Sequence, residues 1–304
     1  MTDERMEYVG VSMRPDGAAI IDSQPKSLSL DDYPTKRPRQ IDRDAIDGET
    51  AALETRMARQ QEVLYGAGTH SVLIILQGMD TSGKDGAVKH VMSAINPAGC
   101  HVWSFKVPTA DELAHDFLWR IHQRTPARGM MAIFNRSQYE DVLIVRVHKL
   151  VPRGVWQKRY EQINAFERLL TENGVILLKF FLHISKDEQR ERLLAREQDP
   201  VKAWKLNVDD WRERALWGDY TAAYEEALAR CGTSWAPWHI VPADSKWYRN
   251  YVIARAIVER LEPYEHAWQR TLSEMGAQRL AELHSARIPE RDAALSALSK
   301  GDAT

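Results

Sequence analysis

The stretch Ser71-Val-Leu-Ile-Ile-Leu-Gln-Gly-Met-Asp-Thr-Ser-Gly-Lys-Asp85 decides the fold of this chain. Its first half is a short apolar run rich in β-branched residues, which is typical of a buried parallel strand. Its second half, from Gly78 to Lys84, matches the G-x-x-x-x-G-K phosphate loop, and the helix predicted over 84–95 follows it. A strand, a glycine-rich loop and a helix in this order predict a P-loop.

The composition of this loop suits a phosphate-binding site. Glycines let the backbone turn its N–H groups around phosphate oxygens, and the next helix presents its positive N-terminal end to the same anion. Lys84 supplies a mobile charge for a transferring phosphate. The residues predicted to bind phosphate or nucleotide here are Gly78, Met79, Thr81, Ser82, Gly83, Lys84 and Gly86.

Two carboxylates in the loop depart from the usual pattern. Asp85 stands where a Ser or Thr normally follows the lysine, and Asp80 lies inside the loop. Because carboxylates repel phosphate, their presence predicts magnesium ions that bridge the loop and the substrate. The alternative for Asp85 is that it only complements the dipole of the helix.

Outward from the loop, strands alternate with helices. This order predicts an α/β fold in three αβα layers, with a parallel sheet covered on both faces. The predicted strands are 71–76, 101–106, 130–134, 175–182 and a short edge strand at 239–241. The predicted helices are 48–65, 84–95, 109–123, 138–149, 155–172, 185–198, 208–230 and 246–261.

The two ends of the chain differ from this core. Residues 1–45 are rich in turn formers and carry the basic cluster Lys36-Arg37-Pro38-Arg39, so we expect an arm with little regular structure. The alternative is an arm that packs on a subunit or contacts an anionic substrate. Residues 265–304 are expected to form a helical extension on the surface, which leaves 46–264 as the P-loop domain.

A second group of candidate residues follows the strand predicted over 130–134. In P-loop enzymes this strand end faces the phosphate loop and carries an acid that holds magnesium. Here that position is Asn135, a neutral residue; Arg136 is suited to bidentate phosphate contact, and Glu140 and Asp141 supply carboxylates for a metal. The alternative for these two acids is an exposed helix face.

The segment 186–205 is predicted to belong to a lid. Arg192 and Arg196 share one helix face, and arginines brought in by a closing lid stabilise a transferring phosphoryl group. Arg190, Lys202 and Lys205 lie nearby and are candidate phosphate-binding residues. The alternative is a salt-bridged surface helix.

Composition and charge exclude several classes of protein. The net charge is only −2, and the chain has no basic tail or paired zinc ligands, which argues against a nucleic-acid partner. Cys100 and Cys231 have no metal-ligand spacing and are expected to be reduced thiols. The N-terminal MTDERMEYVG is not a secretory signal, and no run approaches the roughly 20 apolar residues of a membrane span. We therefore expect a cytoplasmic protein without a membrane partner.

Several motifs together resemble the second family of polyphosphate kinases over about residues 50–262. They are GMDTSGKDG, FNRSQYEDVLIVRVH, KFFLHISKDEQRERL, WKLNVDDW and SKWYRNYV, in this order. The resemblance implies a thymidylate-kinase-like P-loop fold with a helical lid over about 186–217. It also implies reversible phosphoryl transfer between polyphosphate and nucleotides that depends on Mg²⁺, with Mn²⁺ as a substitute.

The FNRSxYEDV version of the second motif resembles the subclass that accepts both AMP and ADP. The resemblance therefore implies AMP, ADP and ATP as ligands, extends to guanine nucleotides, and favours a homo-oligomer, either a dimer or a tetramer. On this interpretation the catalytic residues are Asp80, Lys84, Asp85, Arg136, Arg192 and Arg196, and the metal ligands are Asp80, Asp85, Glu140 and Asp141. The rival hypotheses are a kinase restricted to ADP and GDP, a nucleotide kinase that uses ATP as donor, and a non-catalytic module that senses nucleotide or polyphosphate.

Overall fold

One mixed sheet forms the centre of the molecule. The computed structural model describes residues 11–198 and 208–301, and within them seven strands lie in the order β1-β2-β7-β6-β3-β5-β4. The strands are β1 (Val11–Met13), β2 (Ala19–Ile21), β3 (Ser71–Gln77), β4 (Cys100–Ser104), β5 (Met131–Asn135), β6 (Val175–His183) and β7 (Trp238–Pro242). The pairs β7-β6, β6-β3, β3-β5 and β5-β4 are all parallel, which confirms the predicted parallel sheet for these five strands.

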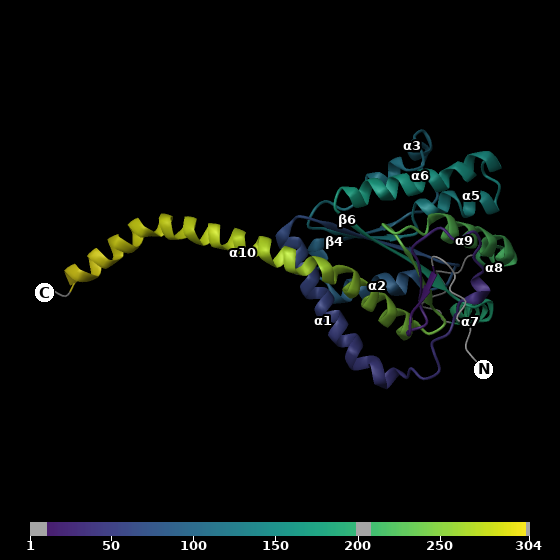
Figure 1. Ribbon diagram of the computed structural model, residues 1–304, viewed down its shortest axis with the longest axis horizontal. Helices are drawn as coiled ribbons and strands as arrows, with labels where there is room; N and C mark the ends of the chain where they lie inside the picture. The colour runs from purple at the N-terminus through teal and green to yellow at the C-terminus, as the bar shows by residue number, and fades with distance from the viewer. Residues whose placement is uncertain (1–10, 199–207, 302–304) are drawn as a thin grey trace.

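Helices cover both faces of the sheet, as predicted (Figure 1). Along β3, Val72, Ile74 and Leu76 face a core completed by α1 (Arg43–Ala67), α2 (Lys84–Ala94) and α10 (Lys246–Gly301). Leu73 and Ile75 face the opposite core, which α6 (Arg153–Glu172) and α9 (Trp217–Cys231) complete. Because side chains alternate along a strand, a continuous apolar strand fills two cores at once.

The N-terminal arm is more regular than the sequence predicted. β1 and β2 form an antiparallel hairpin, and β2 pairs with β7. The prediction of little regular structure is therefore wrong for this segment, and 239–241 is not an edge strand. The overlooked signal is Asp16-Gly17, a turn dipeptide followed by the apolar Ala-Ala-Ile-Ile, and Gly17 adopts φ 71° at that turn.

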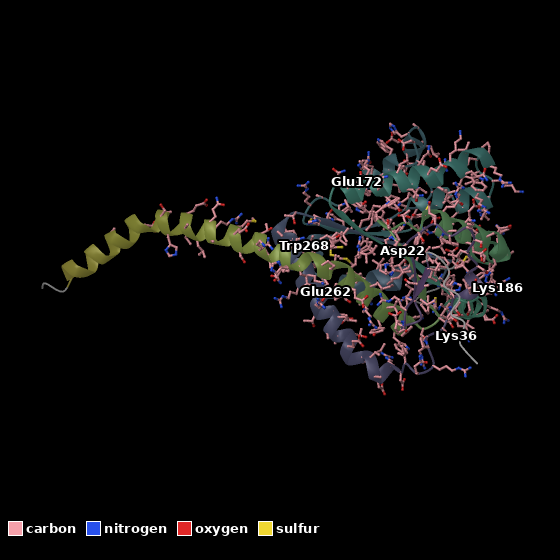
Figure 2. All side chains as sticks on the ribbon, in the orientation of Figure 1. Asp22, Lys36, Glu172, Lys186, Glu262 and Trp268 are labelled. Carbon is pink, nitrogen blue, oxygen red and sulfur yellow. The ribbon has the colours of Figure 1, made fainter. Side chains whose placement is uncertain are left out.

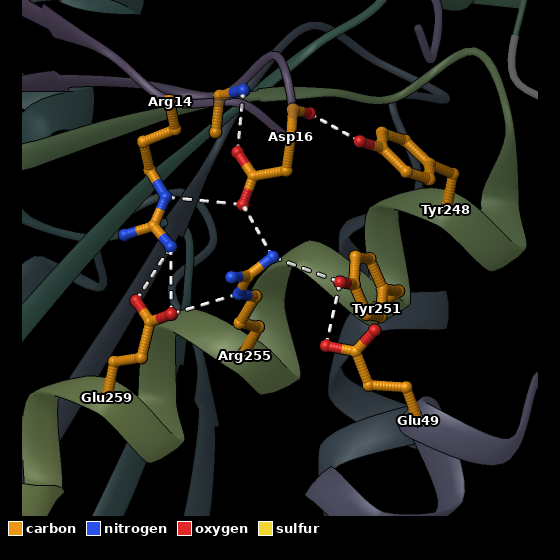
Figure 3. A network of polar contacts seen from close by, with 8 residues as sticks. Arg14, Asp16, Glu49, Tyr248, Tyr251, Arg255 and Glu259 are labelled. Atoms are coloured by element: carbon orange, nitrogen blue, oxygen red, sulfur yellow. Dashed lines mark hydrogen bonds and ion pairs between the residues drawn. The ribbon is translucent and has the colours of Figure 1, made fainter. Parts of the chain in front are cut away.

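A polar network fastens the hairpin turn to the helical layer (Figure 3). The Asp16 side chain is almost fully buried and accepts hydrogen bonds from Arg14 Nε at 3.2 Å and from the Ala18 N–H at 3.1 Å. Arg14 and Arg255 both contact Glu259 of α10. Strands of three residues have too few apolar side chains to be stable alone. The ion pairs between the hairpin turn and α10 help to hold β1 and β2 on the sheet.

The rest of the arm crosses the sheet edge where β6 and β7 end. A short 3₁₀ turn, η1 (Leu30–Asp32), precedes Thr35, whose hydroxyl donates to Asp244 at 2.9 Å. The other carboxylate oxygen of Asp244 accepts from the Ser185 N–H at 2.8 Å, just before α7 (Lys186–Glu197). Asp244 therefore joins the arm to Ser185, the residue that immediately precedes the predicted lid.

Three predicted helices are interrupted. The capping box of Thr109 and Glu112 is present, but it opens only α3 (Ala110–Leu113), and α4 (Trp119–His122) follows separately. The segment 138–149 is a 3₁₀ turn, η3 (Gln138–Asp141), followed by α5 (Ile144–Val147), and 208–230 is divided into α8 (Val208–Ala215) and α9. A further 3₁₀ turn, η2 (Pro97–Gly99), lies in the connection between α2 and β4.

Helix α10 is longer than the sequence predicted. Instead of ending near 261, it runs unbroken from Lys246 to Gly301, so the boundary expected after residue 264 falls inside a helix. Trp268 is fully buried and donates to His70 Nδ1 at 3.2 Å. Leu272, one turn further, still packs against the core, and the rest of the helix projects away from the body (Figures 1 and 2). In the described ranges, no helix is apolar enough over a sufficient length to cross a bilayer.

Candidate active site

The phosphate loop lies between β3 and α2, as predicted. It contains three residues with positive φ: Gly78 at 149°, Thr81 at 62° and Gly83 at 103°. Two loop hydroxyls, Thr81 Oγ1 and Ser82 Oγ, are buried and have no hydrogen-bond partner in the structure. Because buried polar groups are nearly always paired, these hydroxyls fit a loop that receives an anion.

Lys84 is the centre of the loop. Its ammonium donates to the carbonyls of Gly78 at 2.7 Å and Met79 at 3.2 Å. Burial lowers the pKa of Lys84, and the nearby carboxylate of Asp80 opposes this shift. The ammonium thus lies inside the loop, where a phosphate oxygen could replace the weaker of its two carbonyl contacts.

The predicted residues after β5 are brought to the same loop. Asn135 Nδ2 donates to Asp85 at 2.8 Å, and Arg136 Nη2 contacts Asp80 at 3.1 Å. Arg136 has φ 65°, a conformation that costs roughly 1–2 kcal/mol for a residue with a side chain. Its N–H donates to the carbonyl of Leu76 at 3.1 Å, so the end of β3 holds this strained residue in place.

The two acids of η3 point to different surroundings. Glu140 lies 3.9 Å from Arg136, and burial raises the pKa of Glu140 while Arg136 and Lys84 oppose the rise. Asp141 instead pairs with Arg159 of α6 at 2.9 Å, and burial raises its pKa to about 6. The structure therefore brings Glu140 to the loop and places Asp141 against α6, so Asp141 is left out of the metal set proposed below.

The predicted lid residues are dispersed. Arg190 is exposed on α7, and Arg196 pairs with Asp210 of α8 at 3.6 Å. Lys202 and Lys205 lie outside the described residues. Arg192 is only 9% exposed, and it contacts the phosphate loop itself. Of the two arginines expected to share a face above the phosphate, Arg192 is thus directed into the protein.

Arg192 does not have the free N–H groups expected of a phosphate ligand. Its Nε donates to Glu188 at 2.7 Å, and Nη1 donates to the carbonyls of Thr81 and Ser82 at 3.0 and 3.1 Å. Nη2 donates to the carbonyls of Ala243 and Asp244 at 2.7 and 2.8 Å. A guanidinium has five N–H groups, and all are used here. Direct contact of Arg192 with a transferring phosphate would require it to give up one or more of these bonds.

Two further residues support the loop and were not among the predicted site residues. Gln189 Nε2 donates to the carbonyl of Asp80 at 3.0 Å. Arg249 of α10 is buried, and its guanidinium lies where a methyl group on Gly83 would be and 3.0 Å from one on Gly86. Burial and the neighbouring charge of Arg192 lower the pKa of Arg249 to about 10. The i,i+3 spacing of Gln189 and Arg192 was the available signal in the sequence.

The basic cluster of the arm lies beside α7. Lys36, Arg37 and Arg39 line a cavity of about 470 Å³, together with acidic residues. The acidic residues are Asp187, Glu188, Glu191 and Asp244. Because charges of both signs line this cavity, it does not select polyanions by charge alone.

The residues around Lys84 fit a magnesium ion that shares its ligands with a substrate. Asp80, Asp85 and Glu140 provide carboxylate oxygens, and Asn135 lies beside Asp85. Within the described ranges, no group of three or more acidic, histidine or cysteine side chains is placed to hold a metal ion. Mg²⁺ is commonly held by one or two carboxylates together with waters and substrate phosphates, so a partial set of this kind suits it.

Comparison with known proteins shows which family the chain resembles. Residues 40–269 match the family described as Polyphosphate kinase 2 (PPK2). The AMP/ADP-polyphosphate phosphotransferase of Meiothermus ruber is 52% identical over 212 residues, which cover 70% of this chain and 79% of that protein. The ADP-polyphosphate phosphotransferase of Rhodopseudomonas palustris is 46% identical over 71% of this chain and 79% of its own. A crystal structure of Polyphosphate Kinase 2 from Arthrobacter aurescens superposes with a TM-score of 0.74 at 42% identity, covering 78% of this chain and 87% of that one.

Proposed function

Because this chain belongs to the polyphosphate kinase 2 family, we propose that it transfers phosphoryl groups between inorganic polyphosphate and the adenine nucleotides AMP and ADP. The transfer is reversible and depends on Mg²⁺, which Mn²⁺ can replace. The observation that carries the proposal is one cluster in which Lys84 lies among Asp80, Asp85 and Glu140 at the N-terminus of α2. An ammonium surrounded by carboxylates suits a polyanionic substrate only when divalent cations accompany it.

The loop and Lys84 hold the donor phosphates. The loop N–H groups and the start of α2 provide a positive surface, and Lys84 can follow a phosphoryl group as it moves. Arg136 places a guanidinium next to Asp80, where it can neutralise charge on the transferring group. Catalysis of this type needs positioning and charge stabilisation and no covalent enzyme intermediate.

The carboxylates of the site bind the metal and orient the acceptor phosphate. One or two of Asp80, Asp85 and Glu140 would hold the magnesium together with substrate oxygens, and the ion would offset the charge of those oxygens. Asp85 accepts from Asn135, so its carboxylate is oriented at the start of α2, where it can also orient an acceptor phosphate. Asn135 adds no charge, so the acids of the loop and of η3 carry the negative charge of the metal site.

The names of the two relatives differ in the acceptor, and this difference defines a second candidate function. The 52% identical relative is named for AMP and ADP, whereas the 46% identical relative is named for ADP alone. We favour both acceptors because the more similar protein is named for both. The alternative is an enzyme restricted to nucleoside diphosphates, which includes GDP.

A donor-swap assay tests the proposal. The purified protein is incubated with Mg²⁺, polyphosphate and one of AMP, ADP, GMP or GDP, without any nucleoside triphosphate, and products are separated by chromatography. We expect ADP and then ATP from AMP, and ATP from ADP. Product from ADP but not AMP would support the restricted enzyme, and the absence of nucleotide product from every acceptor would refute both. Lys84→Ala protein purified in the same way controls for contaminating kinases.

Three broader expectations accompany this function. We propose residues 46–264 as the catalytic domain, with the arm and the end of α10 as additions. A cytoplasmic location accords with Cys100 and Cys231, which are both free and buried. A homo-oligomer, dimer or tetramer, stays a prediction that light scattering on the purified chain would test.

A further inference from the structure

Helix α7 holds three consecutive carbonyls of the phosphate loop. Gln189 donates to the carbonyl of Asp80 at 3.0 Å. One turn along the helix, Arg192 donates to the carbonyls of Thr81 and Ser82 at 3.0 and 3.1 Å. The helix expected to act as part of a lid is therefore bonded directly to the loop.

These bonds fix the direction of the loop amides. A peptide unit is planar and its C=O and N–H point in opposite directions, so a carbonyl held toward α7 turns the next N–H away from it. The N–H of Ser82 is used inside the loop, since it donates to the carbonyl of Met79 at 3.1 Å. The N–H groups of Thr81 and Gly83 are turned away from α7, on the side opposite to these carbonyls.

The loop conformation needs this support. Thr81 adopts φ 62°, in the left-handed region that residues with a side chain rarely occupy. Such a residue persists only where its surroundings hold it. Arg192 bonds the carbonyl of Thr81 itself, so it stabilises the strained peptide directly.

The same two side chains continue into the neighbouring elements. The second amino group of Arg192 holds the carbonyls of Ala243 and Asp244, between β7 and α10. The side-chain oxygen of Gln189, Oε1, accepts a hydrogen bond from Arg214 of α8 at 2.8 Å. The loop, α7, α8 and the link before α10 are thus joined through two buried side chains.

We propose that Gln189 and Arg192 are positioning residues that orient the peptides of the phosphate loop for substrate. The role of these residues in catalysis rests on the proposed phosphoryl transfer. Their effect on the loop does not rest on it, because the bonds join protein groups to one another. Arg192 acts through the loop backbone, and the arginines that contact phosphate must come from elsewhere.

Two conservative variants test the proposal. Gln189→Met keeps the length and packing of the side chain but removes its donor. Arg192→Lys keeps the charge but replaces a planar five-donor group with a single ammonium, which cannot reach all the present acceptors together. Arg168→Lys is the matched control, because it makes the same chemical change on the exposed face of α6, where Arg168 pairs with Glu172.

The first measurement is hydrogen–deuterium exchange of the free enzyme. We expect exchange in peptides covering residues 78–86 to rise at least threefold in both variants, without a rise in β6 or α6 and without a change in the control. Unchanged exchange in Gln189→Met and Arg192→Lys would overturn the proposal. If Arg192→Lys does not fold, Gln189→Met alone decides.

The second measurement separates positioning from substrate contact. We expect kcat with polyphosphate to fall ten- to a hundredfold in both variants, with KM for polyphosphate within about threefold of the wild type. A KM raised more than tenfold at unchanged kcat and unchanged exchange would show that Arg192 contacts substrate, and would overturn the proposal. Absence of polyphosphate turnover in the wild type would refute the proposed function, while the exchange measurement would still test the loop.

Discussion

A buried ion pair behind the active site should control both stability and activity. Glu167 of α6 and Lys179 of β6 are both fully buried, and their charged atoms lie 2.6 Å apart. Glu167 also accepts from Gln138 at 2.9 Å and from the Tyr139 hydroxyl at 2.7 Å, and Lys179 donates to the carbonyl of Cys231 at 2.7 Å. Gln138 and Tyr139 belong to η3, the turn that also carries Glu140.

The perturbation is Glu167→Gln. It leaves Lys179 charged, buried and without its carboxylate, and breaking a buried pair in this way costs about 3–5 kcal/mol. For a domain of this size, 1 kcal/mol lowers the melting temperature by about 2 °C, so we expect a loss of roughly 6–10 °C. Because η3 loses its charged acceptor, kcat should also fall about tenfold.

The assay is thermal unfolding followed by circular dichroism, with polyphosphate-dependent ATP synthesis measured in parallel. The control is Glu172→Gln on the same helix, because its pair with Arg168 is about 60% exposed. Exposed pairs contribute at most about 1 kcal/mol. The double variant Glu167→Gln with Lys179→Met removes both charges, and we expect it to recover most of the lost stability.

Two results would refute this reasoning. A loss below about 1 kcal/mol in Glu167→Gln would mean that the pair is not desolvated as the structure shows. A double variant less stable than Glu167→Gln would mean that the stability comes from packing or hydrogen bonds of these side chains and not from the balance of charge.

Further predictions concern the loop, a buried histidine and the C-terminal helix. Lys84→Ala should lower kcat on the order of a thousandfold with an unchanged circular dichroism spectrum, and wild-type turnover in that variant would move the active site elsewhere. Burial lowers the pKa of His239 from 6.5 to about 3. As the pH falls from 7.5 to 5, this imidazole therefore binds a proton in the unfolded chain but stays neutral in the folded protein. This costs about 2 kcal/mol of stability by pH 5, and His239→Gln should reduce that acid sensitivity in urea titrations. Deletion of residues 273–304 should shift the melting temperature by less than about 3 °C, whereas Trp268→Ala should cost about 3–5 kcal/mol; equal effects would contradict the packing of α10.

The sequence predicted the fold where one local pattern is sufficient. The continuous apolar run of β3 followed by the glycines of the loop allows few structures other than a buried strand and a P-loop. Asn135 and Arg136 could be placed beside that loop because parallel strands end at the same edge of the sheet. These predictions depend on residues adjacent in the chain, or on a general property of parallel sheets.

The parts that could not be predicted depend on contacts between distant segments. The helical pattern over 138–149 is broken because Tyr139 turns inward to Glu167, 28 residues away. Asp141 differs from its neighbour Glu140 only because Arg159 of α6 lies beside it. Arg192 resembled a phosphate ligand because its spacing with Arg196 is visible in the sequence, whereas its bonds to loop carbonyls more than 100 residues away are not.

The projecting end of α10 offers an attachment point for labels and affects how the protein sediments. From Trp268 to Gly301 the helix rises 1.5 Å per residue, so its end lies roughly 50 Å beyond the last fully buried side chain. A fluorophore, affinity peptide or solid support attached at Gly301 would be carried on a helical spacer, clear of the phosphate loop. The same spacer makes the molecule anisotropic in solution, so its sedimentation should be slower than that of a sphere of equal mass.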